Sequence, residues 1–138
     1  MFDKLTSTMD FHGKALVLRA ERQRAIASNI ANADTPGYVA RDFNFKDAMS
    51  AALSGKALPG SAQGAAAPHP AHLPLAPREG TLGSSMGYAP QVQPALDNNS
   101  VDLDRERGNF VDNAVRYEST LRFINGSSRT ILSAIQGQ

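Results

Sequence analysis

All eight prolines of this 138-residue chain fall between Pro36 and Pro94, and both ends are free of them. Proline inside a helix removes a backbone hydrogen bond and clashes with the preceding turn, so long helices are expected only outside this stretch. Four parts are therefore predicted. They are an N-terminal helix within residues 1–35, a turn, extended segment and short helix over 36–53, an irregular loop over 54–100, and a C-terminal helix within 101–138.

The N-terminal part contains a repeat in which seam residues follow one another at alternating steps of four and three. This spacing, with a period of 3.5 residues, is typical of a helix that packs along a narrow coiled-coil seam. Three of the eight seam positions are polar and Gly13 interrupts the helix, so we do not expect it to be stable alone. The seam consists of Leu5, Met9, His12, Leu16, Arg19, Gln23, Ile26 and Ile30.

The C-terminal part repeats this spacing, and the repeat continues through Gly126, so one uninterrupted helix is predicted. Asp102 is the expected N-cap, and Asp104 and Glu106 place negative charge in the first turn, where the helix dipole favours it. The seam consists of Phe110, Ala114, Tyr117, Leu121, Ile124, Ser128, Ile131 and Ile135.

Two such helices can bury their seams against each other. The predicted fold is mainly α, with two long heptad helices packed as an antiparallel, coiled-coil-like pair and joined by an irregular Pro/Gly/Ala-rich middle. Val39–Phe45 is expected to be extended, and Asn44 is expected to cap a short helix with Phe45, Met49 and Leu53 on one side. Because two helices make only a thin core, the seams are also expected to contact equivalent helices of neighbouring subunits.

The most specific local pattern is the run from Ser28 to Tyr38, SNIANADTPGY. Thr35 precedes proline and is pushed out of the α region, so the first helix is expected to end at or just before Asp34. Pro36 and Gly37 suit the second and third positions of a type II turn. Asparagine amides at a helix end bond free backbone groups. The motif comprises Asn29, Asn32, Asp34, Thr35, Pro36, Gly37 and Tyr38.

The run as a whole resembles the N-terminal signature of the flagellar basal-body rod proteins, and its continuation Val39–Phe43 is most similar to the proximal subunit of the rod. A second stretch, Asn98–Glu106 (NNSVDLDRE), resembles the segment that opens the C-terminal helix in this family. The family commonly has glycine at the position of Asn98, and asparagine also tolerates the left-handed region. The resemblance covers roughly the first and last thirds of the chain.

The resemblance implies a structural subunit that polymerises through its terminal helices into the tubular drive shaft, transmits torque and surrounds the export channel. The implied partners are copies of itself, neighbouring rod proteins, the protein that joins the rod to the membrane ring, the ring itself, and the export apparatus during secretion. The implied location is the periplasm-spanning rod of the basal body. Family members reach it by type III export without a cleaved signal peptide, and residues 1–6 contain no signal-like apolar region.

The residues themselves disfavour catalytic and metal-binding functions. The absence of cysteine excludes disulfides, thiolate catalysis and cysteine-based zinc sites. His69 and His72 lie in a Pro-rich stretch, where a catalytic zinc site would need a third fixed ligand. The acids from Asp102 onward depart from a calcium loop, since Arg107 and Asn113 stand where glycine and an acid are required. We expect no enzyme, cofactor, metal or small-molecule substrate.

Two other functions remain compatible with the sequence. A helical adaptor or chaperone of the flagellar export system would also show heptads, but it would not need the turn at Pro36 and Gly37. A nucleic-acid-binding helix would use the local basic cluster of Lys14, Arg19, Arg22 and Arg24. The net charge of +1 and the lack of interleaved aromatic residues favour a protein that binds no nucleic acid.

Overall fold

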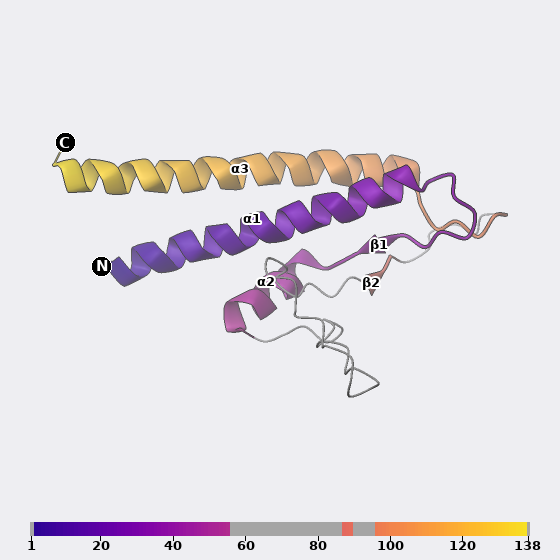
Figure 1. Cartoon of the computed structure of the whole chain (residues 1–138), viewed down its shortest axis with the longest axis horizontal. Helices are drawn as coiled ribbons and strands as arrows, with labels where there is room; N and C mark the ends of the chain where they lie inside the picture. The colour runs from indigo at the N-terminus through magenta and orange to yellow at the C-terminus, as the bar shows by residue number, and fades with distance from the viewer. Residues whose placement is uncertain (1, 56–86, 90–95, 138) are drawn as a thin grey trace, which may run out of the picture.

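The computed structural model describes residues 2–55, 87–89 and 96–137. The elements follow in the order α1 (Phe2–Ala31), β1 (Arg41–Asp42), α2 (Phe45–Ser54), β2 (Gly87–Tyr88) and α3 (Leu103–Gln136). The long helices α1 and α3 lie side by side, and α2 and the two strands lie on the other side of α1 (Figure 1). Both ends of the chain lie at the same end of the molecule, so α1 and α3 run antiparallel.

The predicted mainly helical fold, with two long terminal helices packed against each other, is confirmed. Helix α3 runs without a break through Gly126, as its sequence repeat predicted. Asn44 caps the N-terminus of α2, and its side chain accepts a hydrogen bond from the backbone N–H of Lys46 at 3.0 Å, which confirms the predicted cap. Strand β2 falls inside the stretch expected to be irregular, while His69 and His72 lie outside the described residues.

The apolar core lies where α2 and the segment before it pack on α1. Leu18 is fully buried there although it lies off the predicted seam, because it faces α2 rather than α3. Small alanines on both helices allow the close approach. The core cluster consists of Ala15, Leu18, Phe43, Ala48 and Met49, with Phe45 and Ala52 packed against it.

A part-buried ion pair joins β1 to α1 beside this core. The guanidinium of Arg22 donates from Nε and Nη2 to the two carboxylate oxygens of Asp42 at 3.1 and 3.0 Å. This two-bond geometry fixes orientation as well as distance. The pair therefore holds the extended segment on α1.

The two strands form a minimal antiparallel sheet with Arg41 opposite Tyr88 and Asp42 opposite Gly87. The backbone N–H of Ala89 adds a hydrogen bond to the carbonyl of Ala40 at 2.9 Å. The guanidinium carbon of Arg41 lies 5.9 Å from the centre of the Tyr88 ring. Within the part of the chain that the structure describes, no helix has both the length and the apolar character needed to cross a membrane.

Candidate functional site

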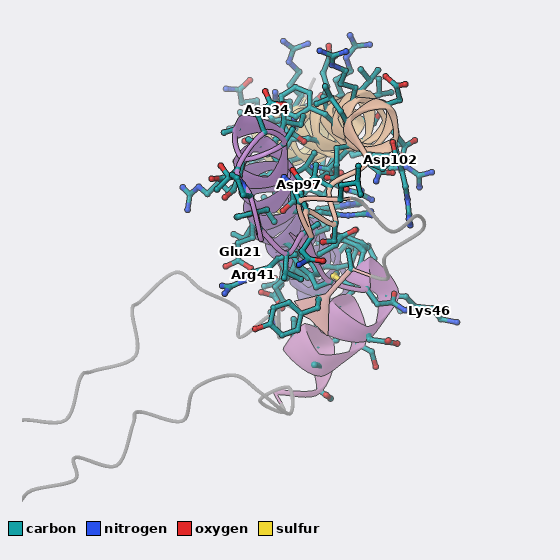
Figure 2. The ribbon with its side chains drawn as sticks, turned by 90° about the vertical axis from the view of Figure 1, so that its right-hand side faces the viewer. Glu21, Asp34, Arg41, Lys46, Asp97 and Asp102 are labelled. Atoms are coloured by element: carbon teal, nitrogen blue, oxygen red, sulfur yellow. The ribbon has the colours of Figure 1, made fainter. Side chains whose placement is uncertain are left out.

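The two sequence motifs meet at one end of the molecule, which we call the helix junction. It comprises residues 28–41, which end α1 and lead into β1, and residues 97–106, which lead into α3. Figure 2 looks onto this end of the molecule, with Asp34, Asp97 and Asp102 labelled around it. Hydrogen bonds between the two stretches join residues that are more than 60 positions apart in the chain.

Helix α1 ends at Ala31, shortly before Asp34 as predicted, and side chains of the motif satisfy its last backbone groups. The amide of Asn32 donates to the carbonyl of Ser28 at 2.8 Å. The hydroxyl of Thr35 in turn donates to Oδ1 of Asn32 at 3.2 Å. These local bonds close the helix end, where carbonyls lack intrahelical donors.

A tight turn follows immediately. The backbone N–H of Tyr38 donates to the carbonyl of Thr35 at 3.2 Å, which closes the turn around Pro36 and Gly37. Gly37 has a φ of 72°, which confirms the positive φ predicted for the third residue of a type II turn. A residue with a Cβ would be strained at this position even though there is space around it.

Asn99 ties the end of α1 to the segment before α3. Its side chain is buried, and Nδ2 donates to the carbonyls of Asn32, Ala33 and Thr35 at 3.0, 2.7 and 2.9 Å. Its Oδ1 accepts from the backbone N–H of Val101 at 2.8 Å. One side chain thus caps a helix that is distant in sequence. Sequence reasoning did not single out Asn99, although it lies inside the second motif.

The residue before it, Asn98, has a φ of 56°, in the left-handed region that was predicted to suit asparagine or glycine. Backbone bonds then join the two segments directly. The N–H of Gly37 donates to the carbonyl of Asp97 at 2.8 Å, and the N–H of Ser100 donates to the carbonyl of Tyr38 at 3.0 Å. The hydroxyl of Ser100 accepts from the N–H of Ala40 at 2.7 Å.

Asn29 lies at the centre of the helix junction and is fully buried. Its Nδ2 donates to the carbonyl of Arg41 at 2.8 Å and to Oε2 of Glu106 at 3.1 Å. Its Oδ1 accepts from the N–H of Arg41 at 3.0 Å and from the hydroxyl of Tyr38 at 3.3 Å. The amide therefore pairs with Arg41 as a neighbouring strand would, and it links α1, β1 and α3 in one contact.

The three acids at the start of α3 occupy different environments. Asp102 is the N-cap, with Oδ1 accepting from the N–H of Arg105 at 3.2 Å. Asp104 is exposed in the first turn, whereas Glu106 is buried against Asn29. Figure 2 shows Asp102 on the α3 side of the junction. Asp102 and Asp104 are thus both exposed near the N-terminus of α3, and one oxygen of Asp102 is occupied by its capping bond.

The predicted seam of α1 differs in burial along its length. Ile26 is fully buried, Met9, Leu16 and Ile30 are half-buried, and Leu5 is 40% exposed. Burial therefore increases toward the helix junction.

The predicted seam of α3 lies partly in the interface with α1 and partly at its edge. Tyr117, Leu121, Ile124 and Ile131 are half-buried, Phe110 is 37% exposed, and Ile135 is 73% exposed. The buried residues of α3 are polar instead and lie seven positions apart. A heptad pattern defined by apolar residues does not include them. They are Glu106, Asn113 and Thr120.

Asn113 reaches α1 through its amide nitrogen, while its Oδ1 is buried without a hydrogen-bond partner among the described residues. Its Nδ2 donates to the carbonyl of Arg19 at 2.9 Å and to Oε1 of Gln23 at 2.6 Å. Gln23 also donates from Nε2 to the carbonyl of Phe110 at 3.4 Å. Burial lowers the pKa of the Arg19 guanidinium, and the nearby charge of Arg116 lowers it further. The interface between the two long helices thus contains directed hydrogen bonds in addition to apolar contacts.

A pocket of about 590 Å³ opens beside the helix junction, between the end of α1, the turn and the strands. Arg24 and Arg41 line it together with Tyr38 and Tyr88. Among the residues that the structure describes, no group of three His, Cys, Asp or Glu side chains is placed to hold a metal ion.

Comparison with known proteins matches the first motif and the whole chain to one family. The family described as "Flagella basal body rod protein" matches residues 9–38, from α1 through the turn. The flagellar basal body rod protein FlgB of Proteus mirabilis (strain HI4320) is 36% identical over 136 residues, which cover 99% of this chain and 98% of that protein. The FlgB proteins of Escherichia coli (strain K12) and Salmonella typhimurium (strain LT2) are each 37% identical over 139 residues, covering 99% of this chain and 98% and 99% of those proteins. With such identity over nearly the full length of each protein, this chain belongs to the family of the flagellar basal body rod protein FlgB.

Proposed function

We propose that the chain is a structural subunit of the flagellar basal-body rod. In this proposal it polymerises through its terminal helices into the tubular drive shaft, transmits torque and surrounds the export channel. Membership of the family supports a role as a component of the rod. The observation that supports assembly is the apolar surface that α1 and α3 leave exposed after packing on each other.

Large apolar side chains remain exposed along both long helices. Contiguous exposed apolar surface on a folded chain marks a place where another molecule packs. Each of these side chains would lose contact with water if a neighbouring helix covered it. The exposed residues are Phe110, Val111, Val115, Phe123, Leu132 and Ile135 on α3, and Leu5, Phe11 and Val17 on α1.

The helix junction has a mechanical role in this proposal. Its hydrogen bonds set the path along which the chain leaves α1 and enters α3, so every copy presents the two helices in the same relative position. A register set by Asn29, Asn99 and Asn113 lets the pair act as one coiled-coil-like building block.

The proposed partners are copies of this chain, neighbouring rod proteins, the protein joining the rod to the membrane ring, the ring, and the export apparatus during secretion. The proposed location is the periplasm-spanning part of the basal body, reached by export without a cleaved signal peptide. The proposal includes no catalysed reaction, cofactor or nucleic acid.

The test is localisation of the full chain in isolated basal bodies. A short peptide tag is added to the chain in cells that lack their own FlgB, and basal bodies are purified and imaged by electron microscopy with tag-specific gold particles. Label on the rod close to the membrane ring is the expected result. Basal bodies without label, with the chain recovered in cytoplasmic complexes of export components, would overturn the proposal in favour of the adaptor or chaperone.

A further inference from the structure

The pocket beside the helix junction has the chemistry of a carboxylate site. Arg24 enters it from α1 and Arg41 from β1, while Tyr38 and Tyr88 supply aromatic walls. None of the described residues that line it is an aspartate or a glutamate. Two guanidinium groups that line one pocket favour binding of a carboxylate, because this planar group can accept two parallel hydrogen bonds from a guanidinium.

Neither arginine has a carboxylate partner within the described parts of the chain. Four other cations do, at 2.6–3.0 Å, and these are Lys14, Arg22, Arg116 and Arg122. The backbone of Arg41 is held on both sides, by Asn29 and by β2, and its guanidinium lies over the ring of Tyr88. The backbone at Arg41 is therefore fixed, and no described carboxylate pairs with the positive charge of the pocket.

A complementary surface lies on the opposite side of the same junction. The N-cap Asp102 and Asp104 in the first turn of α3 are both exposed, and neither forms an ion pair among the residues described in the structure. Viewed along the long axis, Arg41 and Asp102 lie on opposite sides of the molecule (Figure 2). In Figure 1, β1 and the start of α3 lie toward the same end of the long axis.

We propose that the pocket receives the acidic first turn of α3 from a second copy of this chain, as a lateral contact between neighbouring subunits. Copies placed side by side with parallel axes bring that turn to the pocket at the same height. Because the two surfaces differ, the contact is heterologous and repeats from copy to copy rather than closing a dimer. This contact rests on the proposed function, since it requires an assembly of copies.

Charge reversal tests the contact. Arg41→Glu places an acid opposite the acidic turn, and Asp104→Arg places a cation opposite the basic pocket. Each is expected to lower the yield of rods assembled from this chain at least about tenfold, because like charges in a contact oppose association. The double variant Arg41→Glu/Asp104→Arg recreates an attractive pair, and we expect it to recover assembly to within about threefold of the unaltered chain.

Arg129→Glu is the matched control. Arg129 is exposed near the far end of α3, and the substitution changes the net charge by the same amount as Arg41→Glu. Assembly like that of the unaltered chain is the expected result for the control. A loss equal to that of Arg41→Glu would contradict the proposal, because the effect would then follow total charge rather than the pocket.

Crosslinking provides an independent readout, because the chain has no cysteine of its own. The variant Arg24→Cys/Asp104→Cys, treated in assembled rods with a short bismaleimide, is expected to give a ladder of covalent oligomers. Each single-cysteine variant is expected to give none beyond dimers. If the unaltered chain enters rods while both reversals assemble normally and no ladder forms, the pocket contact is wrong and the proposed function stands. If the unaltered chain never enters rods, the proposed function itself fails.

Discussion

The side-chain amide of Asn29 uses both of its donors and both of its acceptor positions at a fully buried site. Two of the four partners are the N–H and the carbonyl of Arg41, so the amide can only be oriented one way. No other residue type of similar size offers a donor and an acceptor side by side. The residue thus connects three segments that would otherwise have to bury unpaired polar groups.

Replacing Asn29 with alanine is therefore expected to lower the free energy of unfolding by about 3 kcal/mol, because the partners lose their bonds without regaining water. Asn29→Asp is expected to cost at least as much, since it places a second carboxylate next to that of Glu106. Urea denaturation followed by far-UV circular dichroism measures both. A loss below about 0.5 kcal/mol for alanine would contradict this account of the junction.

The neighbouring pair Asn98 and Asn99 allows a matched comparison. Asn99→Ala removes the donor to three carbonyls at the end of α1, and we expect it to lower the free energy of unfolding by about 2 kcal/mol. Asn98→Gly is expected to leave stability unchanged or slightly raised, because glycine adopts the φ of 56° without strain.

Thermal unfolding of the two variants measures the difference. Equal melting temperatures for Asn98→Gly and Asn99→Ala would show that the capping bonds contribute little.

At the scale of whole elements, the interface between α1 and α3 changes character along its length. Near the helix junction it contains buried residues such as Ile26 and Asn113. At the open end, Leu5, Leu132 and Ile135 are 40%, 55% and 73% exposed. Figure 1 shows the two helices continuing to that end with no third element covering them. Local stability should follow this gradient.

Hydrogen exchange on the purified, unassembled chain is expected to reveal the gradient. Backbone amides from Leu18 to Asn29 should exchange at least about 100-fold more slowly than those from Asp3 to Phe11, because opening the outer turns exposes little apolar surface. The same difference is expected in α3 between Asn113 and the turns around Leu132. Uniform strong protection over both helices would contradict the prediction, since it would mean that the outer turns are stable without a neighbour.

Local chemistry decides which elements could be predicted from the sequence. The absence of proline indicated both long helices, and the pairing of Pro36 with Gly37 indicated the turn, because these effects act within a few residues. The contacts of Asn99 join residues 64 to 67 positions apart, and no local rule reports them. The pairing of β1 with β2 could not be predicted either, since two-residue strands carry no periodic pattern.

The interface on α3 was hard to predict for a different reason. A seam is sought as repeated apolar residues, whereas the buried heptad positions here are Glu106, Asn113 and Thr120. Two of them have partners on α1, Asn29 for Glu106 and the carbonyl of Arg19 for Asn113, whereas the hydroxyl of Thr120 bonds the carbonyl of Arg116 in its own helix. The partners on α1 are known only once the register of the two helices is known. Polar positions of this kind specify a register at some cost in stability.

At the scale of the whole molecule, burial separates two kinds of apolar residue. Ile26 and Leu18 are covered within one chain, whereas Val111, Val115 and Phe123 are 58–62% exposed on α3. The first group is needed for the chain to fold, and the second is available for contact with other copies. A charged substitution in the first group should therefore impair folding, whereas the same substitution in the second group should impair assembly.

Val115→Asp is expected to change the free energy of unfolding by no more than about 0.5 kcal/mol, because an exposed side chain loses few contacts. It should nevertheless reduce incorporation into rods at least about tenfold, since a neighbouring helix would have to bury the carboxylate. Ile26→Asp is expected to destabilise the chain itself by about 4 kcal/mol, because it buries an unpaired charge in place of an apolar side chain.

Val115→Ile keeps the apolar surface and should assemble normally. Circular dichroism of the purified chains and the amount of each in isolated basal bodies separate folding from assembly. Normal incorporation of Val115→Asp would show that this face of α3 remains exposed to water in the rod, and the assembly surface would then have to lie elsewhere on the helix pair.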